Sequence, residues 1–464
     1  GINMELNRRN VIKLAAGGLG LNLNPLMWSR RAMGDEQAGL TAARIKSCIV
    51  IFYYGGPSHL DMFDTKPNAP SNIRGEFKPI STSVPGLQVS ELLPAHAKIM
   101  HKVAIIRSMH HTNRLHDSAS TESLTGRQSP QGDREEFAPI EQFYPCHGAS
   151  VSYMRRDMNI EVPHAALPWV FHNVVDTPCQ GGGFLGSTYD PFQINGDAAK
   201  VSFQADLFTR RENLSINRLL ERRTLAKKLT ADNLLNSYQQ PQELDKLYTR
   251  AMNLIQSKRL AKALQIEDES QGVREKYGLY PEAPADGVRN VAGYQMRGQN
   301  LLLARRLVEA EVPYVNVYDF RQQGQNWDSH SQNFKEHKNR LVPPMDKAYA
   351  ALINDLDERG LLDSTLVVAL GEFGRTPKIN GNAGRDHWPD CYSLTLAGGG
   401  IQGGAIWGAS DKIGAYPVQD AVTPADLAAT IYWRFGIDPK TIIHDQLGRP
   451  HRLAEGEPIR QLFI

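Results

Sequence analysis

The sequence predicts an α/β fold, a doubly wound and mainly parallel sheet that carries a helical insertion. Two observations lead to this prediction. Short runs of continuous apolar and β-branched residues recur along the 464 residues and stop at Gly, Pro or polar loops. Segments with helical spacing separate those runs, and strands that alternate with helices are typical of a parallel sheet covered on both faces.

The first strand is predicted at Ser47–Tyr54, an unbroken apolar run that stops at Gly55-Gly56-Pro57. Unbroken hydrophobicity bounded by Gly and Pro suits a strand buried on both faces. A second run, Val103–Arg107, leads into Ser108-Met109-His110-His111. Both strands therefore end in loops with polar side chains, and loops after strand ends are where open α/β sheets place their ligands.

Helices precede the next two predicted strands. The helical stretch Gln299–Ala310 comes before a strand at Tyr314–Tyr318. The amphipathic helix Met345–Arg359, with Gly360 as its C-terminal cap, comes before a strand at Ser364–Leu370. This order repeats the alternation that predicts parallel pairing.

A fifth strand is predicted at Leu394–Ala397, and the texture of the chain changes between 202 and 294. That stretch is rich in Leu, Lys, Arg, Glu and Gln at helical spacing, so we expect a helical insertion. It is either a cap over the sheet edge, a dimerisation arm or a solvated helical lobe. The predicted organisation is a leader at 1–40, a first core part at 41–201, the insertion at 202–294 and a second core part at 295–464.

The N-terminal segment predicts export. Arg8-Arg9 precedes a mild apolar stretch at Leu14–Leu23, which resembles a twin-arginine signal. The alternative is an amphipathic helix with an incidental Arg pair. The apolar stretch is about ten residues, short of the roughly twenty that a spanning helix needs. We therefore expect a periplasmic or secreted protein without a transmembrane segment.

Composition excludes one class of partner. The chain has 52 Lys and Arg against 50 Asp and Glu, a net charge of +2, which leaves no basic footprint for nucleic acid. The four cysteines form no CxxC signature. The 14 histidines stand out, because histidine is the commonest metal ligand. His96, His101 and His337 fall on helical stretches, where a surface role is expected.

The other histidines gather with carboxylates after predicted strands, and four loops carry them. The candidate metal ligands are His59 and Asp61 after the first strand, Asp328 and His330 after the third, and Glu372, Asp386 and His387 after the fourth. His116 follows the second strand. Because the ends of parallel strands meet at one edge, we expect these groups to converge on a divalent metal, either Zn, Mn or Ca.

Two arginines flank the same loops. Arg375 and Arg385 are candidate catalytic residues, since Arg forks pair with phosphate or sulfate oxygens. The alternative is that they bridge the acidic ligands and hold them in place. Ser58, in the first loop, is a further candidate catalytic side chain.

The loops resemble domain-of-unknown-function family 1501, exported bacterial sulfatase-like proteins. The motifs that carry the resemblance include Gly55-Gly56-Pro57-Ser58-His59-Leu60-Asp61, Arg107-Ser108-Met109-His110-His111, Leu124-Thr125-Gly126-Arg127, Trp327-Asp328-Ser329-His330, Gly371-Glu372-Phe373-Gly374-Arg375-Thr376-Pro377 and Gly384-Arg385-Asp386-His387-Trp388-Pro389. The family is regarded as a relative of the alkaline phosphatase superfamily. The resemblance implies metals at strand ends and hydrolysis or transfer of phosphate and sulfate esters.

Two departures from the superfamily pattern affect the site. The first strand ends in Gly55-Gly56 where the superfamily has a metal-binding Asp, which leaves His59 or Asp61 as substitutes. Sulfatases carry a Cys or Ser nine residues before the Thr of Thr-Gly-Arg, and this chain has His116 there. If the protein is a hydrolase, His116 is a nucleophile or a ligand, Ser118 or Ser120 attacks directly, or a metal-activated water does.

The leading hypothesis is a periplasmic or secreted metal-dependent hydrolase of phosphate or sulfate esters, with a small-molecule or glycan ester as substrate. The competing hypothesis is a non-catalytic relative that binds or assembles with a partner such as a sulfated glycan. The missing Cys and the missing first Asp favour the second hypothesis, and the four-loop cluster favours the first.

Overall fold

The computed structural model describes residues 45–197, 201–203, 224, 257–279, 291–319 and 327–464, and only the backbone of 291–295. The predicted export signal within 1–40 lies outside these residues, as does most of the predicted insertion at 202–294. The described part of that stretch contains the helices α9 (Lys258–Leu264) and α10 (Gln271–Lys276). The insertion as a unit therefore stays a prediction.

An eight-stranded sheet forms the centre, in the order β14-β4-β13-β10-β1-β9-β5-β6. Its strands are β1 (Ser47–Phe52), β4 (Val103–Met109), β5 (His164–Leu167), β6 (Phe192–Gln193), β9 (Tyr314–Tyr318), β10 (Thr365–Leu370), β13 (Tyr392–Ala397) and β14 (Ile406–Trp407). Neighbours pair in parallel except around β13, which is antiparallel to both β10 and β4. The predicted mainly parallel α/β sheet is confirmed.

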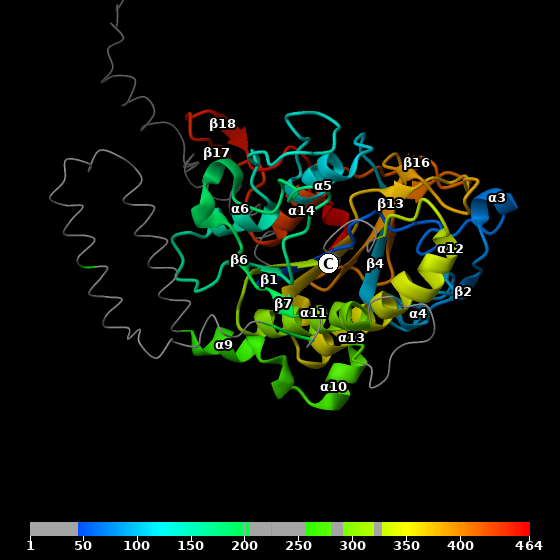
Figure 1. Cartoon of the computed structure of the whole chain (residues 1–464), viewed down its shortest axis with the longest axis horizontal. Coiled ribbons are helices and arrows are strands. Elements are labelled where there is room, and N and C mark those ends of the chain that lie inside the picture. Colours follow the sequence, from blue (N-terminus) through cyan, green and yellow to red (C-terminus); the bar gives the residue numbers. More distant parts are fainter. Residues whose placement is uncertain (1–44, 198–200, 204–223, 225–256, 280–290, 320–326) are drawn as a thin grey trace, which may run out of the picture. The chain divides into compact units, whose positions relative to one another are not determined.

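Helices cover both faces of this sheet (Figure 1). On one side lie α4 (Pro94–Ile99), α11 (Val291–Glu309) and α13 (Val342–Glu358), and on the other α5 (His116–Thr125), α6 (His147–Met154) and α14 (Pro424–Arg434). Side chains of β1 alternate between the two cores: Ile49 and Ile51 belong to the first, Cys48 and Val50 to the second. This double burial explains the unbroken apolar run in the sequence.

The predicted element ends agree with the structure to within a few residues. Beyond the end of β1, the Tyr53 amide still donates to the Leu370 carbonyl at 2.8 Å. Gly360 closes α13 with φ of 66°. Its amide donates to the Asp357 carbonyl at 2.9 Å, and the next amide donates to the Leu356 carbonyl at 2.8 Å. These two bonds are the left-handed helix cap that the sequence predicts.

Smaller elements decorate the core. They are the hairpin pairs β2 (Pro79–Ser81) with β3 (Gln88–Ser90), β7 (Gly196–Asp197) with β8 (Ser202–Phe203), β11 (Gly374–Arg375) with β12 (His387–Trp388), β15 (Ala409–Ser410) with β16 (Pro417–Gln419), and β17 (Ile442–His444) with β18 (Pro450–Arg452), and the short helices α3 (Ser71–Arg74) and α12 (Asn333–Glu336). No helix in the described ranges is both long and apolar enough to span a membrane.

Histidines and cysteines supply part of the core. His96 is 1% exposed and His337 is 0% exposed, so the expected surface role is wrong for both, whereas His101 is exposed. His96 Nδ1 lies 2.7 Å from Asp346 Oδ1, and His337 Nδ1 donates to the Asn333 carbonyl at 2.8 Å. These buried partners satisfy the rings. The four cysteines are all buried and unpaired.

The direction of the strands positions the site. β1, β4, β9 and β10 all run the same way, so their C-terminal ends meet at one edge, as predicted. The antiparallel β13 begins at that edge and ends at the opposite one. The loops that carry the candidate ligands therefore converge, and the glycines after β13 lie away from them.

One buried histidine predicts acid sensitivity of the fold. Burial, and to a lesser degree His164, lowers the pKa of His147 from 6.5 to about 3. Because the unfolded chain takes up a proton at higher pH than the folded chain, stability is lost as the pH falls below 6.5. Between pH 6.5 and pH 4, we expect the free energy of unfolding to fall by roughly 3 kcal/mol less in His147→Phe than in the wild type. Urea unfolding at several pH values measures it, and parallel pH profiles for the two proteins would contradict it.

Candidate metal centre

The loops at this edge bring imidazole and carboxylate groups together. His116 is the first residue of α5, Asp328 and His330 follow β9, and His387 opens β12. One ligand atom each from His116, Asp328 and His387 lies within 4.8 Å of the others. Among the described residues this is the one such group of three or more His, Cys, Asp or Glu. The sequence predicted all four residues, three as ligands and His116 as nucleophile or ligand.

Asp328 lies at the centre of the group. Its Oδ2 is 3.3 Å from His116 Nε2, and its Oδ1 is 3.0 Å from His330 Nε2 and 3.2 Å from His387 Nε2. The carboxylate side chain is 7% exposed. Three ring nitrogens from three different loops therefore face one buried carboxylate.

The opposite nitrogen of each ring is held by an acceptor. His116 Nδ1 lies 2.7 Å from Glu372 Oε1, and His330 Nδ1 lies 2.7 Å from Asp386 Oδ1. The third ring, of His387, donates from Nδ1 to the Arg114 carbonyl at 2.7 Å. Because carbonyl and carboxylate oxygens only accept, the hydrogen sits on Nδ1 in each neutral ring. Each Nε2 therefore faces Asp328, and those of His330 and His387 also lie 3.0 Å from each other.

This arrangement fits a divalent metal ion. In neutral rings, three Nε2 lone pairs would crowd against one carboxylate, which is costly unless a cation lies between them. Ligands about 2.0–2.1 Å from one ion lie roughly 3.3 Å apart in a tetrahedron, close to the separations around Asp328. Imidazole and carboxylate together suit Zn or Mn better than Ca, which prefers oxygen ligands alone.

The protonation of the metal-free centre is uneven. Burial lowers the pKa of His116, but hydrogen bonds to Asp328 and Glu372 outweigh it and raise the pKa to about 9. Burial lowers the pKa of His387 to about 4. The pKa of Asp328 is raised by burial, yet hydrogen bonds from the three histidines hold it far below its usual range. Metal binding must therefore release the proton held by His116.

Glu372 and Asp386 support the rings rather than complete the group. Glu372 is fully buried and accepts from the Gly55 amide at 2.8 Å as well as holding His116. Asp386 is half exposed and holds His330 from outside. Carboxylates behind metal-binding histidines fix the ring orientation.

Arg375 takes the second of its two predicted roles. Its guanidinium is fully buried and donates to Asp328 Oδ1 at 2.6 Å. Three further donors go to the carbonyls of Gly56 at 2.9 Å, Arg385 at 3.1 Å, and Gly55. Four of the five guanidinium N–H donors are therefore engaged inside the protein, where Arg375 holds the acidic group in place.

Ser58, Asp61 and Arg385 form a separate buried network, which corrects their predicted roles. Arg385 pairs with Asp61 at 2.9 Å, and both side chains are 0% exposed. The Ser58 hydroxyl donates to Asp61 at 2.5 Å. Arg385 also donates to the carbonyls of Thr376 at 2.9 Å and Ile73 at 2.7 Å. A carboxylate and a guanidinium with these partners hold the loop together.

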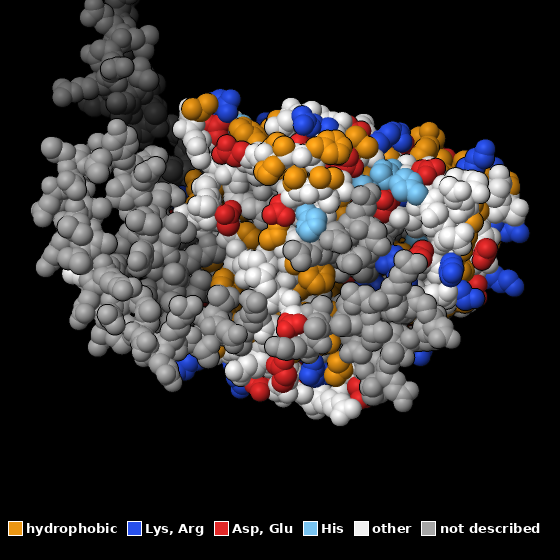
Figure 2. Space-filling view, in the orientation of Figure 1, with side chains coloured by type: hydrophobic (Ala, Val, Ile, Leu, Met, Phe, Trp, Pro, Cys, Tyr) orange, Lys and Arg blue, Asp and Glu red, His pale blue; other side chains and the backbone are white. Residues whose placement is uncertain are grey.

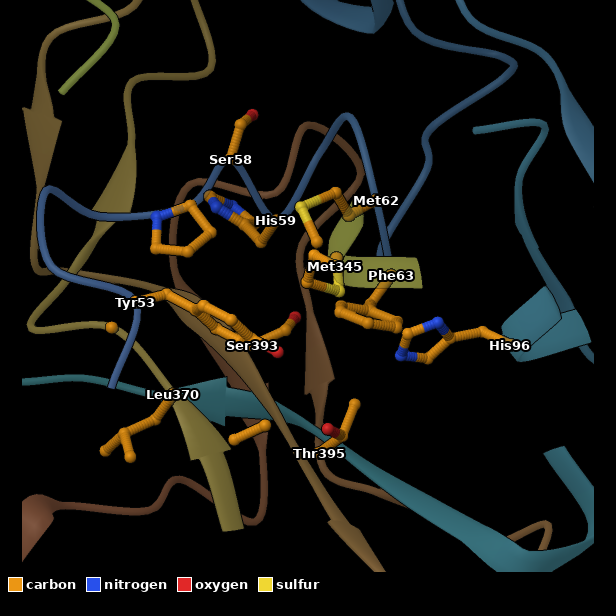
Figure 3. Close-up of a pocket in the computed structure, with 13 residues that line it drawn as sticks. Tyr53, Ser58, His59, Met62, Phe63, His96, Met345, Leu370, Ser393 and Thr395 are labelled. Carbon is orange, nitrogen blue, oxygen red and sulfur yellow. The ribbon is translucent and has the colours of Figure 1, made fainter. Parts of the chain in front are cut away.

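His59 does not join the group either. Its Nε2 donates to the Gly414 carbonyl at 2.8 Å. The ring lines a separate cavity of about 20 Å³ beside Met62, whereas the Ser58 hydroxyl points away from the other labelled side chains (Figure 3). The pKa of His59 is lowered by burial, so the ring is neutral. It serves the packing of the turn after β1.

Three contacts of the centre were not predicted from the sequence. Phe373 stacks on His387, with ring centroids 4.4 Å apart, and the Arg114 backbone orients the same ring. Glu135 accepts from the His116 amide at 2.8 Å. A backbone carbonyl has no side-chain signal, and Glu135 lies in a loop without a motif. Phe373 stood within a quoted motif but has no metal-binding chemistry.

The centre opens to solvent on one side. His330 is 46% exposed, His387 is 16% exposed and His116 is 2% exposed. Histidine and acidic side chains reach the surface in the region where Figure 1 labels β13, β16 and α12 (Figure 2). A ligand would therefore approach from the side of His330.

Comparisons with known proteins add a family. A family model described as "Protein of unknown function (DUF1501)" matches residues 45–463. No protein of curated function matches the sequence. Among solved structures, the lipoteichoic acid synthase LtaP from Listeria monocytogenes is 11% identical, with a TM-score of 0.37, over 89% of this chain and 76% of that chain.

Two further solved structures are similar at the same level. The PsFucS1 sulfatase from Pseudoalteromonas sp. is 13% identical, with a TM-score of 0.36, over 87% of this chain and 70% of that chain. The phosphonate monoester hydrolase SpPMH from Silicibacter pomeroyi is 11% identical, with a TM-score of 0.39, over 91% of this chain and 76% of that chain.

Proposed function

The chain belongs to the family described as protein of unknown function DUF1501, and on that premise we propose that it is a metal-dependent hydrolase of phosphate or sulfate esters. We place its activity in the periplasm or outside the cell, because of the twin-arginine pattern at Arg8-Arg9. The substrate class follows from the resemblance of the family to the alkaline phosphatase superfamily. A small-molecule or glycan ester fits this class.

One observation carries the proposal: three histidines present Nε2 to Asp328 while an acceptor holds each Nδ1. Three such rings around one buried carboxylate form a ligand set with its supporting contacts already in place. His116, Asp328 and His387 would hold the ion, and His330 would contact it from the solvent side.

The residues of the chain have defined tasks in this reaction. A divalent ion would supply Lewis-acid chemistry at the ester oxygen. Arg375 fixes Oδ1 of Asp328 and so orients the carboxylate. Phe373, which is 1% exposed, closes the inner side of the centre against water. His330, the most exposed ring, borders the path by which the ester enters and the product leaves.

Metal content and turnover test the proposal together. Protein purified without chelator is expected to contain about one equivalent of Zn or Mn, and reconstitution with Zn, Mn and Ca compares the ions. Aryl phosphate and aryl sulfate esters then report turnover. Less than one equivalent of any of these metals, with no recovery on reconstitution, would overturn the proposal.

The non-catalytic alternative has its own supporting observation: no cysteine belongs to the described group of ligand atoms, and the two candidate serines have other surroundings. The Ser118 hydroxyl contacts Asp133 at 2.7 Å, and the Ser120 hydroxyl is buried without a partner. A binding or assembly protein would retain metal yet turn over no ester. Turnover that is lost in His387→Ala would exclude this alternative.

A further inference from the structure

An acidic segment at residues 133–136, which we call the acidic strap, lies against the N-terminus of α5. Glu135 accepts hydrogen bonds from the backbone amides of His116 at 2.8 Å and Asp117 at 3.1 Å. The residue that precedes α5 provides no side-chain cap. A carboxylate from another part of the chain thus caps the helix at the residue that enters the metal centre.

A second carboxylate of the strap continues this contact. Asp133 accepts from the amides of Arg114 at 2.9 Å and Leu115 at 3.1 Å. Four consecutive amides, 114 to 117, are therefore bonded to two carboxylates. Amides at a helix N-terminus attract anions through their N–H groups and the helix dipole.

A buried hydroxyl beside this helix end lacks a partner. Tyr54 is 0% exposed, and its hydroxyl makes no hydrogen bond. Its ring lies 5.3 Å from that of His116, and the negative charges of Glu372, Asp117 and Glu135 add to the effect of burial in raising the pKa of its hydroxyl. Burial raises the pKa of Tyr54 well above 10, so its hydroxyl stays protonated and is a hydrogen-bond donor without an acceptor. An anion bound beside His116 would supply one.

The strap can release Glu135 but cannot carry it far. Glu135 is half buried, and Phe137 after it is 76% exposed, so movement here separates little apolar surface. Glu136 is 2% exposed, and its amide donates to Asp117 at 2.8 Å. A displaced Glu135 carboxylate therefore stays close to whatever replaces it.

We propose that Glu135 sets the charge selectivity of the site, favouring singly charged esters such as aryl sulfates over doubly charged phosphate monoesters. The ester group displaces Glu135 from the amides of α5 and then feels its negative charge. Coulomb repulsion is proportional to the charge of the ligand, so a dianion is penalised twice as much as a monoanion. This inference rests on the proposed ester substrate.

The test compares phenyl sulfate with phenyl phosphate at pH 8, where the second is a dianion. Binding is measured by calorimetry to the wild type, to Glu135→Gln and to the control Glu141→Gln, which removes a charge from an exposed position in the same loop. We expect Glu135→Gln to tighten phenyl sulfate about threefold and phenyl phosphate about tenfold, since the repulsion that the variant removes is twice as large for the dianion. Glu141→Gln is expected to match the wild type.

Hydrogen exchange of the wild type gives a second measurement that needs no variant. Saturating phenyl sulfate is expected to speed exchange in the strap, whereas unchanged exchange would overturn displacement. Equal factors for both ligands in Glu135→Gln, or none, would overturn selectivity. Each titration is made once with chelator and once with Zn. If Glu135→Gln changes the binding of the two ligands but no metal binds and no ester is turned over, the hydrolase proposal fails and the charge selectivity is still supported.

Discussion

Asp328→Asn is expected to weaken metal binding strongly and to abolish ester turnover. Asp328 is the carboxylate that three Nε2 atoms face, at 3.0 to 3.3 Å. The amide of Asn removes the negative charge and aims N–H donors where lone pairs converge. We expect a loss of metal affinity of at least about a hundredfold, beyond the range typical of supporting residues. Titration against a chromophoric chelator measures it, and the aryl esters report turnover.

Asp390→Asn is the matched control. Asp390 is a partly exposed carboxylate of the same loop as His387, and it pairs with Arg114 rather than with the ring nitrogens. Its variant is expected to keep the metal affinity of the wild type. Thermal unfolding in chelator checks that Asp328→Asn still folds. A folded Asp328→Asn that binds metal like the wild type would place the metal elsewhere.

The sheet was readable because its strands are buried on both faces. Side chains of an apolar run such as Ser47–Phe52 point to both faces of the sheet, so both faces must be covered by hydrophobic cores. Strand direction was not readable in the same way. β13 carries the same kind of run as β10, yet it pairs antiparallel, because apolar content does not encode direction.

The candidate site was predictable to the level of the loop but not of the contact. Parallel strand ends predicted that Asp328, His330 and His387 would meet, and the structure brings them together. Sequence spacing does not show which carboxylate faces an arginine. Asp61 pairs with Arg385, and Glu372 holds the far nitrogen of His116. In the structure, neither carboxylate therefore faces the group as the sequence suggested. Metal binding by the group itself stays a prediction.

Contacts supplied from a distance were beyond the sequence. Glu135 accepts from the amide of His116 although a loop of irregular backbone separates the two residues in sequence. Leu115, the residue before the helix, provides no side-chain cap, so the sequence carries no local signal for the start of this helix. The helical histidines show the same limit. His337 lies in a stretch rich in polar residues, yet its ring is buried, because its Nδ1–H donates a hydrogen bond to the backbone carbonyl of Asn333. Burial of a polar side chain depends on such partners, and partners are a property of the fold.

Arg385→Met is expected to destabilise the protein without changing which anions it binds. Arg385 and Asp61 are both 0% exposed and lie 2.9 Å apart, so the variant leaves a buried carboxylate without its cation. The free energy of unfolding should fall by about 3–5 kcal/mol, and the double variant with Asp61→Asn should recover part of it. Urea unfolding in chelator measures both. Lys440→Met, which breaks an exposed ion pair with Glu457, is expected to leave the midpoint unchanged. An Arg385→Met protein of normal stability that no longer binds phenyl sulfate would instead restore the anion-holding role that the sequence suggested.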